Sequence, residues 1–218
     1  MAVVGIDGGG LDDLLGLAVL GRERGTRRWL LSCRAWAHEC VLERRKEIAP
    51  RLRDFAAEGT LRIVPDGSGE DIDEVVEFVE MLDKASLLPA KGAIGVDPAG
   101  IADVADALEL AGFSCDPTEG RVVGIRQGAL TQNTTLLTAE RRLAAKDMVH
   151  DGSALMRWVV GNAKVELRGN AKTITKQAAG TAKIDPLLAA FNCVYLLGRN
   201  PQARKFQLMV FGKTGTRR

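Results

Sequence analysis

The sequence lacks the features that mark membrane, secreted and disulfide-bonded proteins. No uninterrupted apolar run reaches the roughly 18 residues of a membrane span, and no basic N-terminal region leads into an apolar segment with a cleavage site. The cysteines, Cys33, Cys40, Cys115 and Cys193, form no C-x-x-C pair. They suggest buried thiols rather than a zinc site or a disulfide framework. We therefore expect a soluble, intracellular protein.

A phosphate-binding loop is also missing. Gly212-Lys213-Thr214 matches the end of the G-x-x-x-x-G-K-[ST] pattern, but Gln207 stands where the first glycine belongs. Too few residues follow for the helix that such a loop requires.

The chain has the composition of an ordinary globular protein. It contains 218 residues, of which 46% are apolar and 27% charged, which is enough for one substantial core. We expect one domain over residues 1–198 and a basic tail over 199–218, in which Phe206–Phe211 could add an edge strand.

Charge is divided unevenly along the chain. Residues 1–120 carry 13 Lys and Arg against 23 Asp and Glu, whereas residues 121–218 carry 17 against 5. An acidic half that gathers metal ions and a basic half that meets a polyanion would produce this division. Two halves that complement each other across their interface would produce it equally well, so charge alone leaves both interpretations open.

Three apolar stretches adjoin an aspartate. Val3-Val4-Gly5-Ile6-Asp7 is followed by three glycines, Ala93-Ile94-Gly95-Val96-Asp97 by Pro98, and Lys183-Ile184-Asp185-Pro186 opens an apolar helix. A buried strand would carry Asp7 to its tip, and the glycines would let other backbone or a phosphate come close. We expect the fold to bring these three acids together to hold divalent metal ions.

The order of the predicted elements indicates an α/β fold. Two strands, Leu14–Leu20 and Trp29–Ala37, follow the first as an antiparallel meander, and strands and helices alternate after residue 40. Later strands are predicted at Leu61–Val64, Ala93–Val96 and Arg121–Ile125, and helices at Val41–Glu58, Asp71–Ala85, Ala99–Ala111, Thr131–Val149, Ser153–Asn162 and Leu187–Leu197. This order predicts a mixed sheet, with its later strands parallel and helices on its faces.

Four aspartates allow more than one interpretation. Asp97 and Asp185 precede prolines, so each could cap a helix as well as bind a metal ion. Asp12 and Asp13 lie at the mouth of the second strand, where each is a supplementary metal ligand, an outer-sphere partner or a solvated turn acid.

A basic β-hairpin is predicted between Lys164 and Lys176, around Gly169-Asn170. Cationic side chains at strand spacing would neutralise successive DNA phosphates, although a solvated edge hairpin protected by lysines has the same pattern. The candidate DNA-binding residues are Lys164, Arg168, Lys172, Lys176 and, beside the last acid, Lys183. Lys183 is near enough to that acid to assist a phosphate, although a lone lysine is more often an ordinary surface residue. Contacts to the backbone rather than to bases predict weak sequence preference.

Three carboxylates from separate elements suit Mg²⁺ or Mn²⁺, which prefer oxygen ligands and retain several waters. Two such ions roughly 3.5 to 4 Å apart can activate a water and stabilise the leaving oxygen of a displacement at phosphorus. Such chemistry needs acids from different elements to converge on one point, as Asp7, Asp97 and Asp185 would.

Five short motifs resemble the C-terminal nuclease domain of the large terminase subunit of tailed bacteriophages. In chain order they are Gly5-Ile6-Asp7 with Asp13-Leu14, Gly95-Val96-Asp97-Pro98, Arg126-Gln127-Gly128, Trp158 with Asn162, and Lys183-Ile184-Asp185-Pro186. The resemblance implies an RNase H-like fold and an endonuclease that cuts double-stranded DNA during genome packaging, with two Mg²⁺ or Mn²⁺ ions.

The same resemblance assigns residues and partners. It carries the catalytic and metal-binding roles over to Asp7, Asp97 and Asp185, and it matches Asp13 to a further acid of the family. On this resemblance we expect hydrolysis of a DNA phosphodiester, with Asp7 bridging two ions and Asp97 and Asp185 each completing one. It implies a terminase ATPase domain, a small terminase subunit and a portal as partners, and the cytoplasm of the infected bacterial host as the location.

Two other functions fit parts of the sequence. Val4–Gly10 also resembles the first phosphate loop of sugar kinases with an actin-like fold, but those enzymes need two such domains and a second glycine-rich loop. The other alternative is a catalytically silent RNase H-like module that only binds DNA or packaging partners. Three gathered acids argue against it, because like charges without a metal would destabilise the site.

Overall fold

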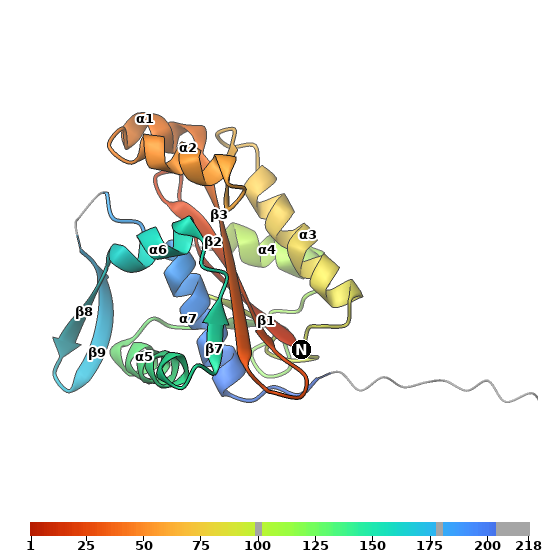
Figure 1. The fold of residues 1–218 in the computed structure, drawn as a ribbon. Helices are drawn as coiled ribbons and strands as arrows, with labels where there is room; N and C mark the ends of the chain where they lie inside the picture. Colours follow the sequence, from red (N-terminus) through yellow and green to blue (C-terminus); the bar gives the residue numbers. More distant parts are fainter. Residues whose placement is uncertain (99–101, 178–180, 204–218) are drawn as a thin grey trace, which may run out of the picture.

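A mixed sheet of seven strands organises the protein (Figure 1). The computed structural model describes residues 1–98, 102–177 and 181–203. The strand order is β4-β3-β2-β1-β5-β6, and β7 pairs with another part of β3. The bounds are β1 Ala2–Gly8, β2 Leu14–Arg22, β3 Trp29–His38, β4 Leu61–Val64, β5 Ile94–Val96, β6 Val122–Gly124 and β7 Met148–His150. Strands β1 to β3 pair antiparallel and β1, β5 and β6 parallel, which confirms the predicted fold class.

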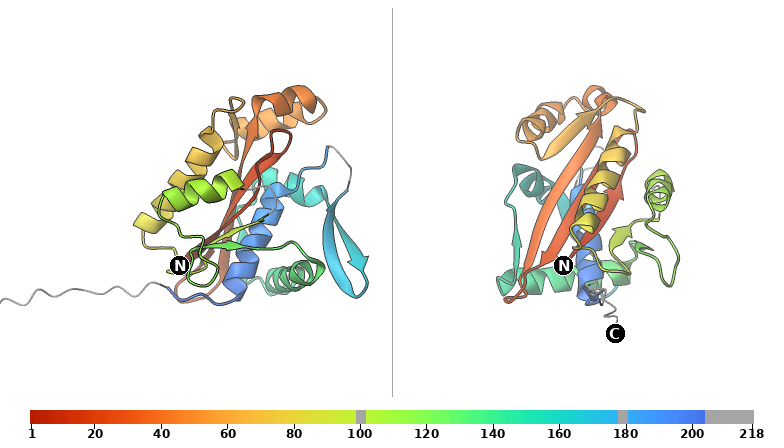
Figure 2. Two further views of the ribbon diagram at one scale, coloured as in Figure 1. Left: turned by 180° about the vertical axis from the view of Figure 1, so that it is seen from behind. Right: turned by 90° about the vertical axis from the view of Figure 1, so that its right-hand side faces the viewer.

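Helices cover both faces of this sheet (Figure 2). They are α1 Glu39–Arg44, α2 Ala49–Ala57, α3 Glu70–Lys84, α4 Ala102–Leu110, α5 Ala129–Ala144, α6 Ala154–Gly161 and α7 Asp185–Gly198. Alternate residues of a strand point to opposite faces. Val3 and Leu14 therefore join a core with α2, α6 and α7, whereas Val4 and Leu15 join a core with α3 and α4. Burial on both faces explains why the first strand is apolar without alternation.

The single helix predicted over Val41–Glu58 is wrong, because two helices stand there. The first ends at Arg44 and the second begins at Ala49, with Pro50 in its first turn. A continuous helix would place the ring of Pro50 against the carbonyl of Lys46, whereas a helix start needs no N–H from proline.

The predicted helix over Thr131–Val149 is also wrong at its C-terminal end. Helix α5 ends at Ala144, and Lys146 has a φ of 59°, in the left-handed region where a helix cannot continue. The next residues form β7, which lies parallel to β3 with Met148 opposite Trp29. This pairing is a long-range contact that a local pattern does not reveal.

The predicted hairpin is confirmed as a separate two-stranded sheet, with β8 at Ala163–Arg168 and β9 at Ala171–Lys176. It packs beside α5, where Asn133 Oδ1 accepts a hydrogen bond of 2.9 Å from the backbone N–H of Lys172. Helix α6 is confirmed too, and the Ser153 hydroxyl caps it by accepting from the N–H of Met156.

Two further predictions fall outside the described residues. The start of the helix predicted at Ala99 lies in 99–101, and Phe206–Phe211 lies in 204–218. Within the described ranges, no helix combines the length and the apolar character needed to cross a membrane.

Candidate active site

Asp7 and Asp97 are brought together by the pairing of two parallel strands. Ile6 of β1 pairs with Val96 of β5, so the two aspartates follow equivalent positions at the same edge of the sheet. Asp7 is buried, with 5% of its surface exposed. The proximity of Asp97 is one of the causes that raise the pKa of Asp7, so the two carboxylates are electrostatic neighbours.

Asp185 reaches the same place because glycines let α7 lie directly on β1 and β2. A Cβ on Gly5 would stand 2.0 Å from the carbonyl oxygen of Ala189, and one on Gly16 would stand 2.6 Å from the nitrogen of Pro186. Near Asp7, the side-chain amide of Asn192 donates a hydrogen bond of 3.0 Å to the carbonyl of Ile6. The first turn of α7 is thereby fixed against the strand end that carries Asp7.

The start of α7 differs slightly from the prediction. Ile184 is the N-cap residue and Asp185 is the first residue of the helix, so the predicted cap at Asp185 is wrong by one position. A carboxylate in the first turn is still favoured by the positive end of the helix dipole.

The glycines after Asp7 permit a backbone conformation and a close backbone contact that other residues would not. Gly8 and Gly9 have φ values of 89° and 108°, which glycine adopts without strain. A Cβ on Gly8 would lie 2.0 Å from the carbonyl oxygen of Leu14 and 3.1 Å from the Cβ of Asp185. The sequence left open whether other backbone or a phosphate comes close to these glycines. In the structure, the backbone of Leu14 lies against Gly8.

Burial and mutual repulsion make two of the acids hard to ionise. Burial, followed by the charges of Asp185, Asp97 and Asp13, raises the pKa of Asp7 to about 8. Burial and then Asp13 raise the pKa of Asp185 to about 7. Burial and like charges at close range produce such values, and carboxylates with perturbed pKa values cluster at functional sites.

Asp13 behaves in the opposite way because two lysines contact it. Although burial opposes the change, hydrogen bonds from Lys183, Asp185 and Lys176 lower the pKa of Asp13. Lys183 Nζ lies 2.9 Å from Asp13 Oδ1, and Lys176 Nζ lies 3.0 Å from Asp13 Oδ2 and 3.9 Å from Asp185 Oδ1. Asp13 is therefore the ionised member of its pair with Asp185, and both of its oxygens are engaged by cations.

Asp12 points to a different partner from Asp13. Its carboxylate pairs with Arg45, and its backbone carbonyl accepts a hydrogen bond from Lys183. Asp12 therefore contributes to the site through its main chain, and its side chain lies outside the group formed by the other acids.

Carboxylates are suitable ligands for a divalent cation, but the side chains of the described acids do not form a coordination sphere. The Oδ2 atom of Asp185 is buried and has no hydrogen-bond partner among the described residues. A buried carboxylate oxygen without a partner is a strong candidate to ligate a metal ion. Within the same residues, however, no three His, Cys, Asp or Glu side chains lie close enough together to hold one ion.

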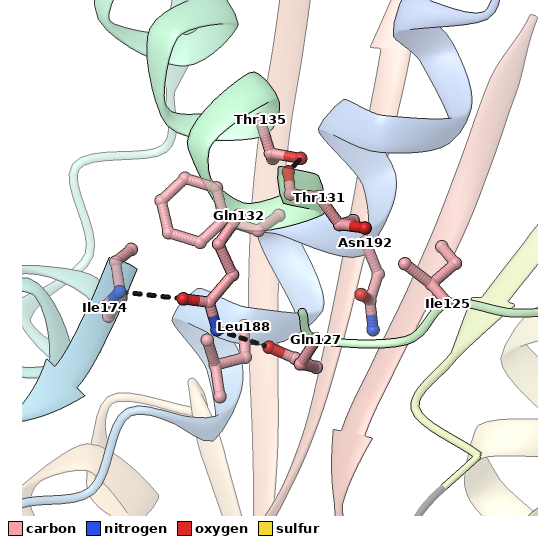
Figure 3. Close-up of a pocket in the computed structure, with 9 residues that line it drawn as sticks. Ile125, Gln127, Thr131, Gln132, Thr135, Ile174, Leu188 and Asn192 are labelled. Carbon is pink, nitrogen blue, oxygen red and sulfur yellow. Dashed lines mark hydrogen bonds between the residues drawn. The ribbon is translucent and has the colours of Figure 1, made fainter. Parts of the chain in front are cut away.

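Gln127 is a site residue to which the sequence assigned no chemistry. Its Nε2 donates a hydrogen bond of 2.8 Å to Asp7 Oδ1. Its Oε1 accepts one of 3.4 Å from Gln132 Nε2 (Figure 3). The Oε1 of Gln132 in turn accepts from the backbone N–H of Ile174 at 2.9 Å. This chain of contacts connects Asp7 to the hairpin. The available signal was the position of Gln127, shortly after the end of β6, the parallel neighbour of β5.

The predicted DNA-binding residues divide between surface and interior. Arg168 is exposed on the hairpin, where Lys164 pairs with Glu166 at 3.0 Å and Lys172 with Glu140 at 3.2 Å. Lys176 faces the acids from the end of β9. Lys183 is buried at 3% exposure, so the surface position considered for it from the sequence is wrong.

The raised pKa values predict that stability falls with pH when no metal is present. A carboxyl whose folded-state pKa exceeds its unfolded value stabilises the fold below the unfolded value, near 4, and loses that contribution as pH rises through the folded value. In EDTA, the free energy of unfolding should fall by about 2 kcal/mol or more between pH 5 and pH 8. Urea unfolding at both pH values measures it, and equal stability at both would contradict the cause given for the shifts.

The fold is that of phage terminase nucleases. The chain superposes on the crystal structure of the HK97 bacteriophage large terminase with a TM-score of 0.70 and 21% identity, over 89% of this chain and 39% of that one. It thus spans well under half of the HK97 protein. The large terminase nuclease from thermophilic phage G20c matches over 89% of this chain and 81% of its own, with a TM-score of 0.54 and 10% identity.

A second structure of the G20c nuclease, solved with bound magnesium, matches with a TM-score of 0.53, 10% identity, and coverage of 89% and 80%. No protein-family model and no curated protein sequence matches the chain. These likenesses confirm the RNase H-like fold that the motifs implied.

Proposed function

We propose that this chain is a Mg²⁺- or Mn²⁺-dependent endonuclease that cuts double-stranded DNA during phage genome packaging. The observation that supports the proposal is the proximity of Asp185 and Asp97 to Asp7, whose pKa both charges raise, in a fold that matches a terminase nuclease solved with magnesium. The proposal includes three partners, namely a terminase ATPase domain, a small terminase subunit and a portal. It places the protein in the cytoplasm of the infected bacterial host.

Asp7, Asp97 and Asp185 would hold two ions, with Asp7 shared between them. Bound ions of this kind activate a water and stabilise the leaving oxygen of a phosphodiester. Gln127 fixes the orientation of Asp7, and the close packing of α7 fixes that of Asp185. Lys176 and Lys183 keep Asp13 ionised and turned toward themselves, so Asp13 acts as an outer partner of the three ligands.

The hairpin would contact the DNA backbone. Lys164, Arg168 and Lys172 present cations along an element that also touches the acid cluster through Lys176. Since such contacts reach phosphates rather than base edges, we propose weak sequence preference. The buried Lys183 is assigned to Asp13 instead of to DNA.

Nicking of supercoiled plasmid tests the proposal. The parent protein should nick plasmid in Mn²⁺ and not in EDTA, and Asp97→Ala should reduce the rate at least about 100-fold because one metal ligand is lost. Asp106→Ala, which removes an exposed acid of α4, is the matched control and should leave the rate unchanged. Undiminished nicking by Asp97→Ala would exclude the assigned site.

The catalytically silent module remains the second candidate, and one observation favours it. Lysine ammonium groups already lie among the acids, where they neutralise part of the charge without a metal. A parent protein that binds duplex DNA but produces no nicks in Mg²⁺ or Mn²⁺ would establish this alternative. Nothing in the comparisons favours the sugar-kinase interpretation.

A further inference from the structure

A second basic site lies at the opposite end of α7 from the acids. The turn between β2 and β3, the last turn of α5 and the residues after α7 meet there (Figure 1). Residues of these segments line an open hollow of about 370 Å³. Three arginines line it, namely Arg22, Arg27 and Arg142. We call this site the arginine hollow.

The three guanidinium groups take part in none of the ion pairs found in the described part of the chain. Within the described residues none of the three forms an ion pair, whereas Arg28, Arg45, Arg62 and Arg121 each pair with a carboxylate. Asp147 lines the hollow as well, without forming an ion pair there. Burial and then the charges of Arg27 and Arg142 lower the pKa of Arg22. The hollow therefore places three guanidinium groups beside one carboxylate, so positive charge is in excess there.

Only part of this charge has a structural explanation. Arg142 lies in the last turn of α5, and Arg22 donates hydrogen bonds to Asn200 Oδ1 and the Pro201 carbonyl just after α7, so both complement the negative ends of helices. Arg27 does not. It is exposed, sits in the β2–β3 turn with a φ of 63°, and adds a third cation where two repel already.

The shape of the hollow indicates what kind of group it accepts. The ring of Trp29 is 2% exposed and is covered by the guanidinium of Arg142, 3.8 Å from its centroid. No aromatic face of Trp29 is thus offered to a base. Guanidinium groups present planar forks of N–H donors that match the oxygens of a phosphate.

We propose that the arginine hollow binds a phosphate group. The 14 residues of α7 separate it from Asp185 by about 20 Å, at 1.5 Å per residue. Resting on the proposed function, the phosphate belongs to the backbone of the DNA that is cut, at a point several base pairs from the acids. Free inorganic phosphate is the other source of the same chemistry.

Duplex binding by single arginine variants tests the proposal. We would measure the anisotropy of a labelled 20-base-pair duplex (about two helical turns) in EDTA, over a range of salt concentrations, with the whole chain. Arg27→Asn removes a charge and suits the left-handed backbone, so it should fold normally. It should weaken binding about five- to tenfold and reduce the slope of log K against log salt by about 1.

Arg53→Gln, at an exposed position of α2, is the matched control and should change neither quantity. Titration calorimetry with inorganic phosphate distinguishes the two sources. Unchanged duplex binding by Arg27→Asn, together with phosphate binding that only the parent shows, would assign the hollow to free phosphate. If Arg27→Asn and Arg142→Gln leave both ligands unaffected, the proposal is overturned, and the nuclease proposal is judged separately by plasmid nicking.

Discussion

Replacement of Asp7 by Asn should reduce plasmid nicking in Mn²⁺ at least about 1000-fold, because the shared ligand of both proposed ions is lost. The same variant should be more stable than the parent in EDTA at pH 8. Its neutral amide removes a buried charge, and its remaining oxygen can still accept from Gln127. Nicking rates and urea unfolding measure the two effects.

These opposite changes distinguish a lost ligand from a damaged fold. Asp106→Asn, at the exposed position on α4, is the control and should change neither quantity. Binding of a labelled duplex in EDTA should be unaffected by Asp7→Asn or slightly stronger. An Asp7→Asn protein that still nicks at half the parent rate would contradict the assignment of Asp7.

Replacement of Gly5 by Ala should destabilise the protein by about 3 kcal/mol or more. The new Cβ would stand 2.0 Å from the carbonyl oxygen of Ala189 and 3.0 Å from the nitrogen of Cys193, both backbone atoms of α7. The helix must move away from β1, and Asp185 moves with it. A fall in melting temperature of roughly 6 to 12 °C is expected for a chain of this size, with loss of nicking even where the variant is folded.

Gly10→Ala is the matched control for this prediction. No heavy atom lies within 4 Å of a Cβ at Gly10, and its backbone is outside the left-handed region. Its melting temperature should stay within about 1 °C of the parent value. If Gly5→Ala has the same melting temperature as Gly10→Ala, close packing of α7 does not position Asp185.

The strands, and the positions of Asp7 and Asp97 at strand ends, were predictable because each depends on a short local pattern. An apolar run that ends at Asp7 or Asp97 predicts a buried strand with a carboxylate at its tip, and the parallel pairing of β1 with β5 then sets these positions side by side. Helix α6 was predictable for a similar reason, since Ser153 is an ordinary cap before an apolar run.

The errors arose where a distant or backbone contact overrides the local pattern. The charged stretch after Val41 has helical spacing throughout, but Pro50 divides it. The stretch around Met148 continues an apparent helix, but its pairing with β3 makes it a strand.

The interior of the site was the least predictable part. Lys183 looks like a surface lysine in the sequence, yet tertiary packing buries it against Asp13. The contact of Gln127 with Asp7 joins residues 120 positions apart, and no periodicity records it. The proximity of Asp7 and Asp97 was thus predictable from the strands, whereas the contacts of Gln127 and Lys183 with the acids were not.

A crystal of the protein soaked in Mn²⁺ and measured near the manganese absorption edge tests the central claim most directly. We predict anomalous peaks for two ions bounded by the carboxylates of Asp7, Asp97 and Asp185, with Asp7 contacting both. A protein that nicks plasmid while its only manganese peaks lie away from these three carboxylates would contradict the account.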